Sequence, residues 1–117
     1  MIDLTRDPLP KADMMLVRDC LFHLSFEAIY HFLNNFCRSD IRFLLTTQHI
    51  PPSEANTDIL NGDYRDIDLF APPFHFPADP LFDIIDDNIN VPNKHLLLFD
   101  HMQVNAARDA MKANLGI

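Results

Sequence analysis

The chain has 117 residues, a formal net charge of −8 and 48% hydrophobic residues. This length predicts a single domain over residues 1–117, and the hydrophobic content excludes a disordered chain. The excess of 17 acidic over 9 basic side chains disfavours binding to nucleic acid, because the phosphate backbone attracts a basic surface. The apolar runs are far shorter than a membrane-spanning segment, so no membrane partner is expected.

The usage of glycine and cysteine narrows the functional classes further. Gly62 and Gly116 are the two glycines and stand far apart, so the sequence holds no glycine-rich loop for a nucleotide phosphate. Cys20 and Cys37 are too few for a disulfide framework, and no apolar N-terminal stretch predicts a signal peptide. We therefore expect a cytoplasmic protein.

The first half of the chain predicts a strand, a helix and a second strand. The apolar run at 12–17 lacks the alternation of a half-solvated strand and is typical of a strand buried on both faces. Ser25 is a suitable N-cap for a helix over 25–38, and residues 41–47 are rich in β-formers. A strand, a helix and a second strand in this order form a crossover connection, which predicts that the two strands are parallel neighbours in one sheet. The helix is expected to face the sheet through Leu33 and Phe36, opposite Leu16, Val17, Phe43 and Leu45.

The second half predicts an irregular segment, a hairpin and a helix. Residues 51–80 hold six of the nine prolines, which indicates an extended surface excursion with a short strand near 65–70. The remaining predicted elements are strands at 81–85 and 95–99, a polar hairpin loop over 86–94, and a helix over 103–114.

Short motifs run along the chain in a definite order: Asp3-Leu4-Thr5, Asp7-Pro8-Leu9-Pro10, Ala12-Asp13, Arg18-Asp19-Cys20-Leu21, His23-Leu24-Ser25, Leu44-Leu45-Thr46-Thr47, Asn56, Asp58-Ile59, Gly62, Arg65, Pro72-Pro73-Phe74 and Pro77. This string resembles the class I S-adenosylmethionine-dependent methyltransferases over roughly residues 3–100, in the C-terminal half of their fold only. The resemblance implies an α/β fold, a partial Rossmann-like sheet with strands in the order 4-5-7-6 and 25–38 as the main crossover helix. The family's glycine-rich motif after strand 1 and its acidic ribose ligand after strand 2 have no counterpart here.

The resemblance implies that the loop after the first predicted strand lines the cofactor and acceptor pocket. Arg18 and Asp19 are then the candidate contacts to the cofactor, S-adenosylmethionine. Asp19 and His23 are the candidate catalytic residues, with His23 as a base because imidazole titrates near neutrality. The structural alternative is an Arg18–Asp19 ion pair with a packed or capping His23. Cys20 is disfavoured as a nucleophile, because cysteines in such loops are usually buried and inert.

Further candidates follow the second strand and lie in the excursion. Thr47 and His49 leave that strand at the same sheet edge, where they bind the acceptor or simply begin a polar loop. Asn56 and Arg65 match family positions that would cover the pocket and are candidate substrate-binding residues. For these two we favour the structural alternative, in which they hold the long loop through hydrogen bonds to its backbone. The histidine spacing predicts no metal site.

The function predicted from these observations is an S-adenosylmethionine-dependent methyltransferase-like domain with a small-molecule or protein acceptor. It is expected to be incomplete or inactive as an isolated chain, because the glycine-rich cofactor loop is absent. The alternatives are a non-enzymatic oligomerisation or interaction module derived from this fold, and part of a longer enzyme. A strand at 12–17 would form a sheet edge with no charge in its run Met14-Met15-Leu16-Val17, so we expect a homodimer whose interface includes residues 12–17.

Overall fold

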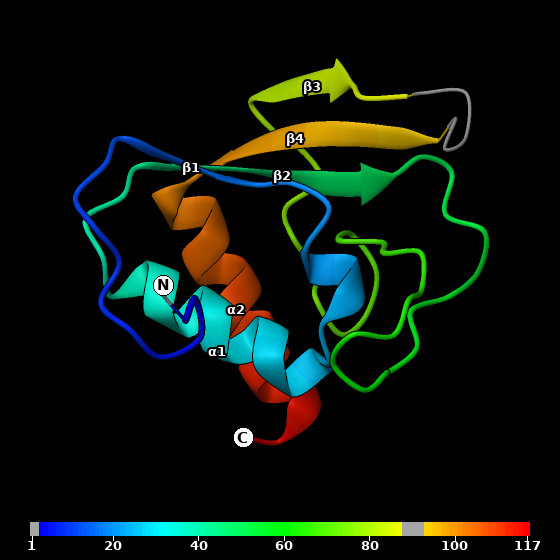
Figure 1. Cartoon of the computed structure of the whole chain (residues 1–117), viewed down its shortest axis with the longest axis horizontal. Coiled ribbons are helices and arrows are strands. Elements are labelled where there is room, and N and C mark those ends of the chain that lie inside the picture. Colours follow the sequence, from blue (N-terminus) through cyan, green and yellow to red (C-terminus); the bar gives the residue numbers. More distant parts are fainter. Residues whose placement is uncertain (1–2, 88–92) are drawn as a thin grey trace.

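A computed structural model describes residues 3–87 and 93–117, which form a four-stranded sheet and two long helices (Figure 1). The strands are β1 (Met14–Val17), β2 (Phe43–His49), β3 (Phe82–Ile85) and β4 (Lys94–Asp100); the helices are η1 (Leu21–His23), α1 (Phe26–Cys37) and α2 (His101–Leu115). The predicted α/β class is confirmed. Part of the predicted hairpin loop over 86–94 lies outside the described residues.

The sheet is mixed, with the strands in the order β1-β2-β4-β3. β1 and β2 are parallel, and β4 runs antiparallel to both of its neighbours, β2 and β3. The pairing of Leu16 with Leu45, and of Leu45 with Leu98, shows that side chains at these positions share one face. The carboxyl ends of β1, β2 and β3 therefore lie beside the amino end of β4. This side of the sheet, where these strand ends meet, is called the carboxyl edge below.

Helix α1 forms where the sequence predicts it. The Ser25 hydroxyl accepts a hydrogen bond from the Ala28 N–H (3.1 Å), which satisfies one of the free donors of the first turn. Glu27 in that turn also favours the positive end of the helix dipole. The helix buries one apolar stripe in the core, which includes Ile29, Phe32, Leu33 and Phe36.

Helix α2 begins earlier than the predicted 103–114, directly at the end of β4. Asp100 accepts a hydrogen bond from the Gln103 N–H (2.8 Å), and the Gln103 side chain accepts one from the Asp100 N–H (2.9 Å). This reciprocal capping box lets the helix start without a connecting loop. The helix ends at Leu115, and the capping residue Gly116 has a φ of 69°, in the left-handed region that glycine adopts readily.

The excursion, residues 51–80, contains no helix or strand, so the predicted short strand near 65–70 is wrong. Residues 51–64 are exposed or half-buried, as predicted for a surface excursion, but the later part of the segment is not on the surface. Four of its apolar side chains are buried in the core with those of the helices: Ile67, Leu69, Phe74 and Phe76. The excursion is held to the end of β2 by the His49 N–H, which donates to the Ile67 carbonyl (3.3 Å).

Both long helices lie on one side of the sheet, as Figure 1 shows with the sheet above and the helices below. On that covered face, the apolar strand residues Val17, Leu44, Leu97 and Phe99 are almost completely buried. The expectation that Leu16, Phe43 and Leu45 also face α1 is wrong. Side chains alternate along a strand, so the residues next to Val17 and Leu44 point to the other side of the sheet.

The opposite side of the sheet is called the bare face below. It carries eight apolar side chains, two from each strand, and every one of them is at least partly exposed. They are Met14 and Leu16 of β1, Phe43 and Leu45 of β2, Leu96 and Leu98 of β4, and Phe82 and Ile84 of β3.

Candidate functional site

Polar side chains from all four strands gather where the strand ends meet. Arg18 and Asp19 follow β1, Thr47 lies near the end of β2, Asp86 follows β3, and Lys94 begins β4. The Asp19 N–H donates to Thr47 Oγ1 (2.9 Å), which joins the two parallel strands beyond their ladder. Asp19 has a φ of 54°, in the left-handed region that few non-glycine residues adopt. The predicted residues Arg18, Asp19 and Thr47 are therefore brought together.

Two cations and two carboxylates form an ion network at this edge. Arg18 binds Asp86 through Nε and Nη2 (2.9 and 2.8 Å), and this hydrogen bonding raises the pKa of Arg18. Lys94, which is buried, donates from Nζ to Asp19 (2.8 Å) and lies 3.9 Å from Asp86. Arg18 Nε lies 4.0 Å from Asp19. Both carboxylates are thus already balanced by cations of the same chain.

Lys94 and Asp86 were not predicted as site residues, because both fell in what the sequence indicates is a solvated hairpin loop. The antiparallel direction of β4 brings its first residue to the edge where β1 and β2 end. The sequence feature that could have indicated Lys94 is its position as the first residue of a strand that runs antiparallel to β2.

His23 faces the excursion rather than Asp19. Its Nδ1 lies 2.8 Å from the Asp63 carbonyl oxygen, which assigns the proton to Nδ1 and leaves Nε2 as the acceptor. Its ring packs against Phe22, with the ring centroids 4.6 Å apart. Within the described residues, no hydrogen bond joins His23 to Arg18 or Asp19. Burial raises the pKa of the neighbouring Cys20 thiol, which weakens it further as a nucleophile.

His49 is fully buried and belongs to a second cluster. Its Nδ1 accepts a hydrogen bond from the Ile67 N–H (2.9 Å), so the neutral ring carries its proton on Nε2. Nε2 lies 3.4 Å from the Tyr64 hydroxyl and 3.8 Å from Asp66, and the Tyr64 hydroxyl donates to Asp66. The ring of Phe22 packs against both His49 and Tyr64, at centroid distances of 5.2 and 5.4 Å, and so links this cluster to His23.

The protonation states of this cluster favour a structural role at neutral pH. Burial lowers the pKa of His49, against the opposing effect of Asp66, so the ring is neutral. Burial and the hydrogen bond to Asp66 raise the pKa of Tyr64 to about 12. Burial opposes ionisation of Asp66, but hydrogen bonds from Tyr64 and Ser53 outweigh it and lower its pKa. The three groups therefore form a neutral imidazole, a neutral phenol and a carboxylate that hold the excursion on β2.

Asn56 and Arg65 both bond to backbone. The Asn56 amide donates to the carbonyls of Asp68 and Pro72 (2.8 Å each), and its oxygen accepts from the Asp68 N–H (2.9 Å). The buried Arg65 guanidinium donates to the carbonyls that bracket η1, at Leu21 (3.3 Å) and Leu24 (2.8 Å), and burial lowers its pKa. These contacts are those of the structural alternative favoured from the sequence.

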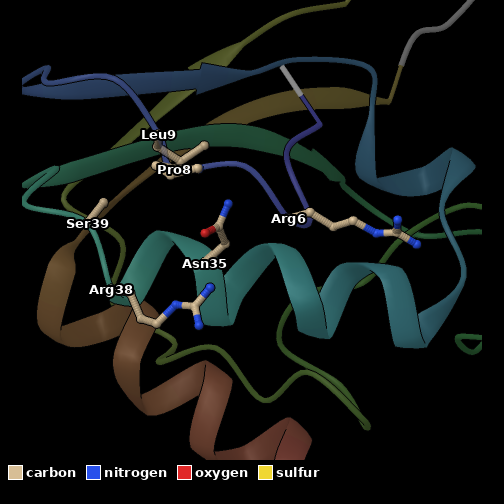
Figure 2. Close-up of a pocket in the computed structure, with 6 residues that line it drawn as sticks. All are labelled: Arg6, Pro8, Leu9, Asn35, Arg38 and Ser39. Atoms are coloured by element: carbon tan, nitrogen blue, oxygen red, sulfur yellow. The ribbon is translucent and has the colours of Figure 1, made fainter. Parts of the chain in front are cut away.

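A cavity of about 280 Å³ lies at the opposite, amino-terminal end of the sheet (Figure 2). Asn35 of α1 stands at its centre and donates to the carbonyls of Leu4 (2.9 Å) and Asp7 (2.7 Å), which fixes the N-terminal segment across the helix. Arg6 extends away from Asn35 in Figure 2. The cavity therefore lies where the N-terminal segment crosses α1.

The residues at the carboxyl edge do not by themselves fit S-adenosylmethionine. Their charged groups are bonded to one another, and neither glycine follows β1 in the sequence, since Gly62 is in the excursion and Gly116 follows α2. In residues 3–87 and 93–117, no group of three histidine, cysteine, aspartate or glutamate side chains is placed to hold a metal ion. None of the helices in that part of the chain is long and apolar enough to cross a membrane.

Comparison of the chain with family models, with curated proteins and with solved structures found no match.

Proposed function

We propose that this chain is an S-adenosylmethionine-dependent methyltransferase-like domain, equivalent to the C-terminal half of the class I fold and incomplete as an isolated chain. The observation that carries the proposal is the order and direction of the strands, β1-β2-β4-β3 with β4 antiparallel. It is the order that the resemblance implies for strands 4-5-7-6, with α1 in the place of the crossover helix. The acceptor in this proposal is a small molecule or a protein.

The candidate residues for such a site lie at the carboxyl edge. Ligands of α/β sheets bind outside the carboxyl ends of the parallel strands, where Arg18 and Asp19 lie. Asp19 keeps 42% of its side chain exposed and has room for a further hydrogen bond. In this proposal the free Nε2 of His23 accepts a proton, Thr47 holds the Asp19 loop and His49 holds the excursion. The missing half of the site would come from another polypeptide segment.

Calorimetric titration with S-adenosylmethionine tests this proposal. The isolated chain is expected to bind it weakly or not at all, because neither a glycine turn nor a ribose carboxylate is available. Micromolar affinity would overturn the statement that the site is incomplete. In that case the Asp19→Asn variant, compared with Asp109→Asn on the exposed side of α2, shows whether the carboxyl edge is responsible.

The second candidate function is a non-enzymatic interaction module, and the ion network favours it. The carboxylates of Asp19 and Asp86 form ion pairs within the chain. Such pairing is typical of residues that stabilise the fold, whereas residues of a binding site keep charged groups free for a ligand. β1 is an edge strand with no charged side chain between Met14 and Val17, so we propose a homodimer whose interface includes residues 12–17. The free cysteines Cys20 and Cys37 suit a reducing cytoplasm.

A further inference from the structure

The bare face is a continuous apolar surface that spans all four strands. Its side chains on the two edge strands are the most exposed, with Leu16 of β1 at 54% and Phe82 of β3 at 66%. Those of the central strands, β2 and β4, are partly exposed between them. Contiguous apolar surface of this extent marks an interaction site in proteins of this size.

The amino-acid sequence of the strands also indicates that this face is covered in the functional state. Strands with one solvated face alternate polar and apolar residues, whereas strands covered on both faces do not. β1 is apolar at all four positions, and β4 is apolar at four successive positions, 96–99. Half of these side chains point to the helices, and the other half point to the bare face.

Charged groups are confined to the ends of the bare face. At the amino-terminal end, the Arg42 guanidinium lies over the ring of Phe43, 5.2 Å from its centroid. At the carboxyl end lie Arg18 and Lys94 with their carboxylate partners. The eight central side chains are all uncharged. An apolar centre with a polar rim is the anatomy of a protein–protein interface.

We propose that a second copy of this chain packs on the bare face, bare face against bare face, around a two-fold axis. An uncharged apolar surface is complementary to itself, and two sheets packed in this way interdigitate their side chains. The four side chains on the edge strands can each lose about 100 Å² of accessible area and the four on the central strands about 50 Å² each, so each copy buries about 600 Å² and the pair about 1,200 Å², which is the lower bound of a specific interface.

This inference rests on the proposed homodimer and specifies its surface. Met14 and Leu16 place residues 12–17 in the interface through their side chains, without backbone pairing between two β1 edges. Residues of β3 distinguish packing through the bare faces from backbone pairing between two β1 edges. Phe82 of β3 lies on the bare face, but three strands away from the β1 edge.

Sedimentation of the full chain and of two matched variants tests the arrangement. Phe82→Lys places a charge on the β3 side of the proposed interface and is expected to weaken the dimer by at least about tenfold. Ile85→Lys is the control, because Ile85 lies on the same strand, is 70% exposed and points to the opposite side. Circular dichroism verifies that both variants are folded. The parent chain and the Ile85→Lys variant are expected to remain dimers at tens of micromolar.

Leu16→Lys is the second variant, since it changes the same face on the opposite edge strand and should also produce a monomer. If Phe82→Lys stays dimeric, the two copies do not meet through the bare face. If Ile85→Lys dissociates as readily as Phe82→Lys, the face assignment is overturned. A monomeric parent chain would overturn both this inference and the homodimer, but not the methyltransferase-like proposal, which the cofactor titration tests separately.

Discussion

The two faces of the sheet have similar side chains and different surroundings. On the covered face, Val17, Leu44 and Phe99 lie on the side that α1 and α2 cover and are almost fully buried. On the bare face, side chains of the same kinds are partly or half exposed. The difference arises because each strand alternates its side chains between the faces, while both helices return to the same side. Hydrophobicity alone therefore does not show which apolar residues stabilise the monomer.

The covered face contributes to folding of the single chain, whereas the bare face contributes to assembly. Burial on the covered face stabilises the single chain, because those side chains leave water when the helices pack. Burial on the bare face requires a second molecule, so its contribution depends on protein concentration. Substitutions on the two faces should therefore affect different measurements.

The largest expected effect is on the covered side of the sheet. Leu33 of α1 is completely buried, so Leu33→Ala should lower the free energy of unfolding by about 2–5 kcal/mol. Leu16→Ala on the bare face is the matched control, and it should cost far less in dilute, monomeric protein because Leu16 is already half exposed. Urea titration measures both. Equal losses for the two variants would contradict the distinction between the faces.

A second comparison uses two adjacent residues of one strand. Met15 packs against the core and Leu16 points to the bare face. Met15→Lys is expected to lower the stability of the monomer by about 1–3 kcal/mol, because a charged group must leave water. Leu16→Lys should leave it within about 0.5 kcal/mol while it abolishes the dimer. Thermal melting of dilute protein, together with light scattering, separates the two outcomes; a reversed order would mean that the strand faces are assigned wrongly.

Much of the fold could be predicted because its signals are local. The cap at Ser25 and the apolar spacing after it located α1, and the unalternated run at 12–17 located β1. The predicted burial of β1 on both faces is wrong for the single chain, because Met14 and Leu16 are about half exposed. The excursion was misjudged because its proline content indicates irregular backbone but says nothing of burial. Ile67 and Leu69 are buried by contacts with distant segments, which no local pattern contains.

The candidate site was predicted in part for the same reason. Asp19 and Thr47 follow two parallel strands, and that topology alone brings them together. Lys94 was missed because its role depends on the register of β4 against β2. His23 shares the loop with Asp19, but the turn of η1 directs its ring to the excursion. The predicted catalytic pairing of Asp19 with His23 stays a prediction.

At the end of β2, the strand is covered by the excursion rather than by a helix. Burial lowers the pKa of His49 in the folded chain below its usual 6.5. Below pH 6.5 the unfolded chain binds the proton first, so stability should fall as the pH drops, by at most about 1.4 kcal/mol per pH unit, until the folded-state pKa is reached.

Urea titrations between pH 7.5 and 5 measure this dependence. His49→Asn is the informative variant, because its amide oxygen can still accept the Ile67 N–H but does not titrate. Its unfolding free energy should change less over that range than that of the parent chain. An unchanged slope in the variant would assign the pH dependence to another group. The lowered pKa of Asp66 adds a separate loss that begins only at more acidic pH, near the usual carboxylate range.

The smallest expected effect concerns the helix that covers one face and not the other. α2 starts directly from β4 because Asp100 caps its first turn. Asp100→Ala removes that acceptor and should lower the free energy of unfolding by about 1 kcal/mol, the usual cost of losing an N-cap. Asp109→Ala, at an exposed position of the same helix, is the control and should change stability by less than about 0.5 kcal/mol. Hydrogen exchange of the α2 amides should rise in the Asp100 variant, because a frayed first turn exposes them. If exchange rises instead at β1 and β2, the capping box stabilises the sheet directly rather than the helix that covers it.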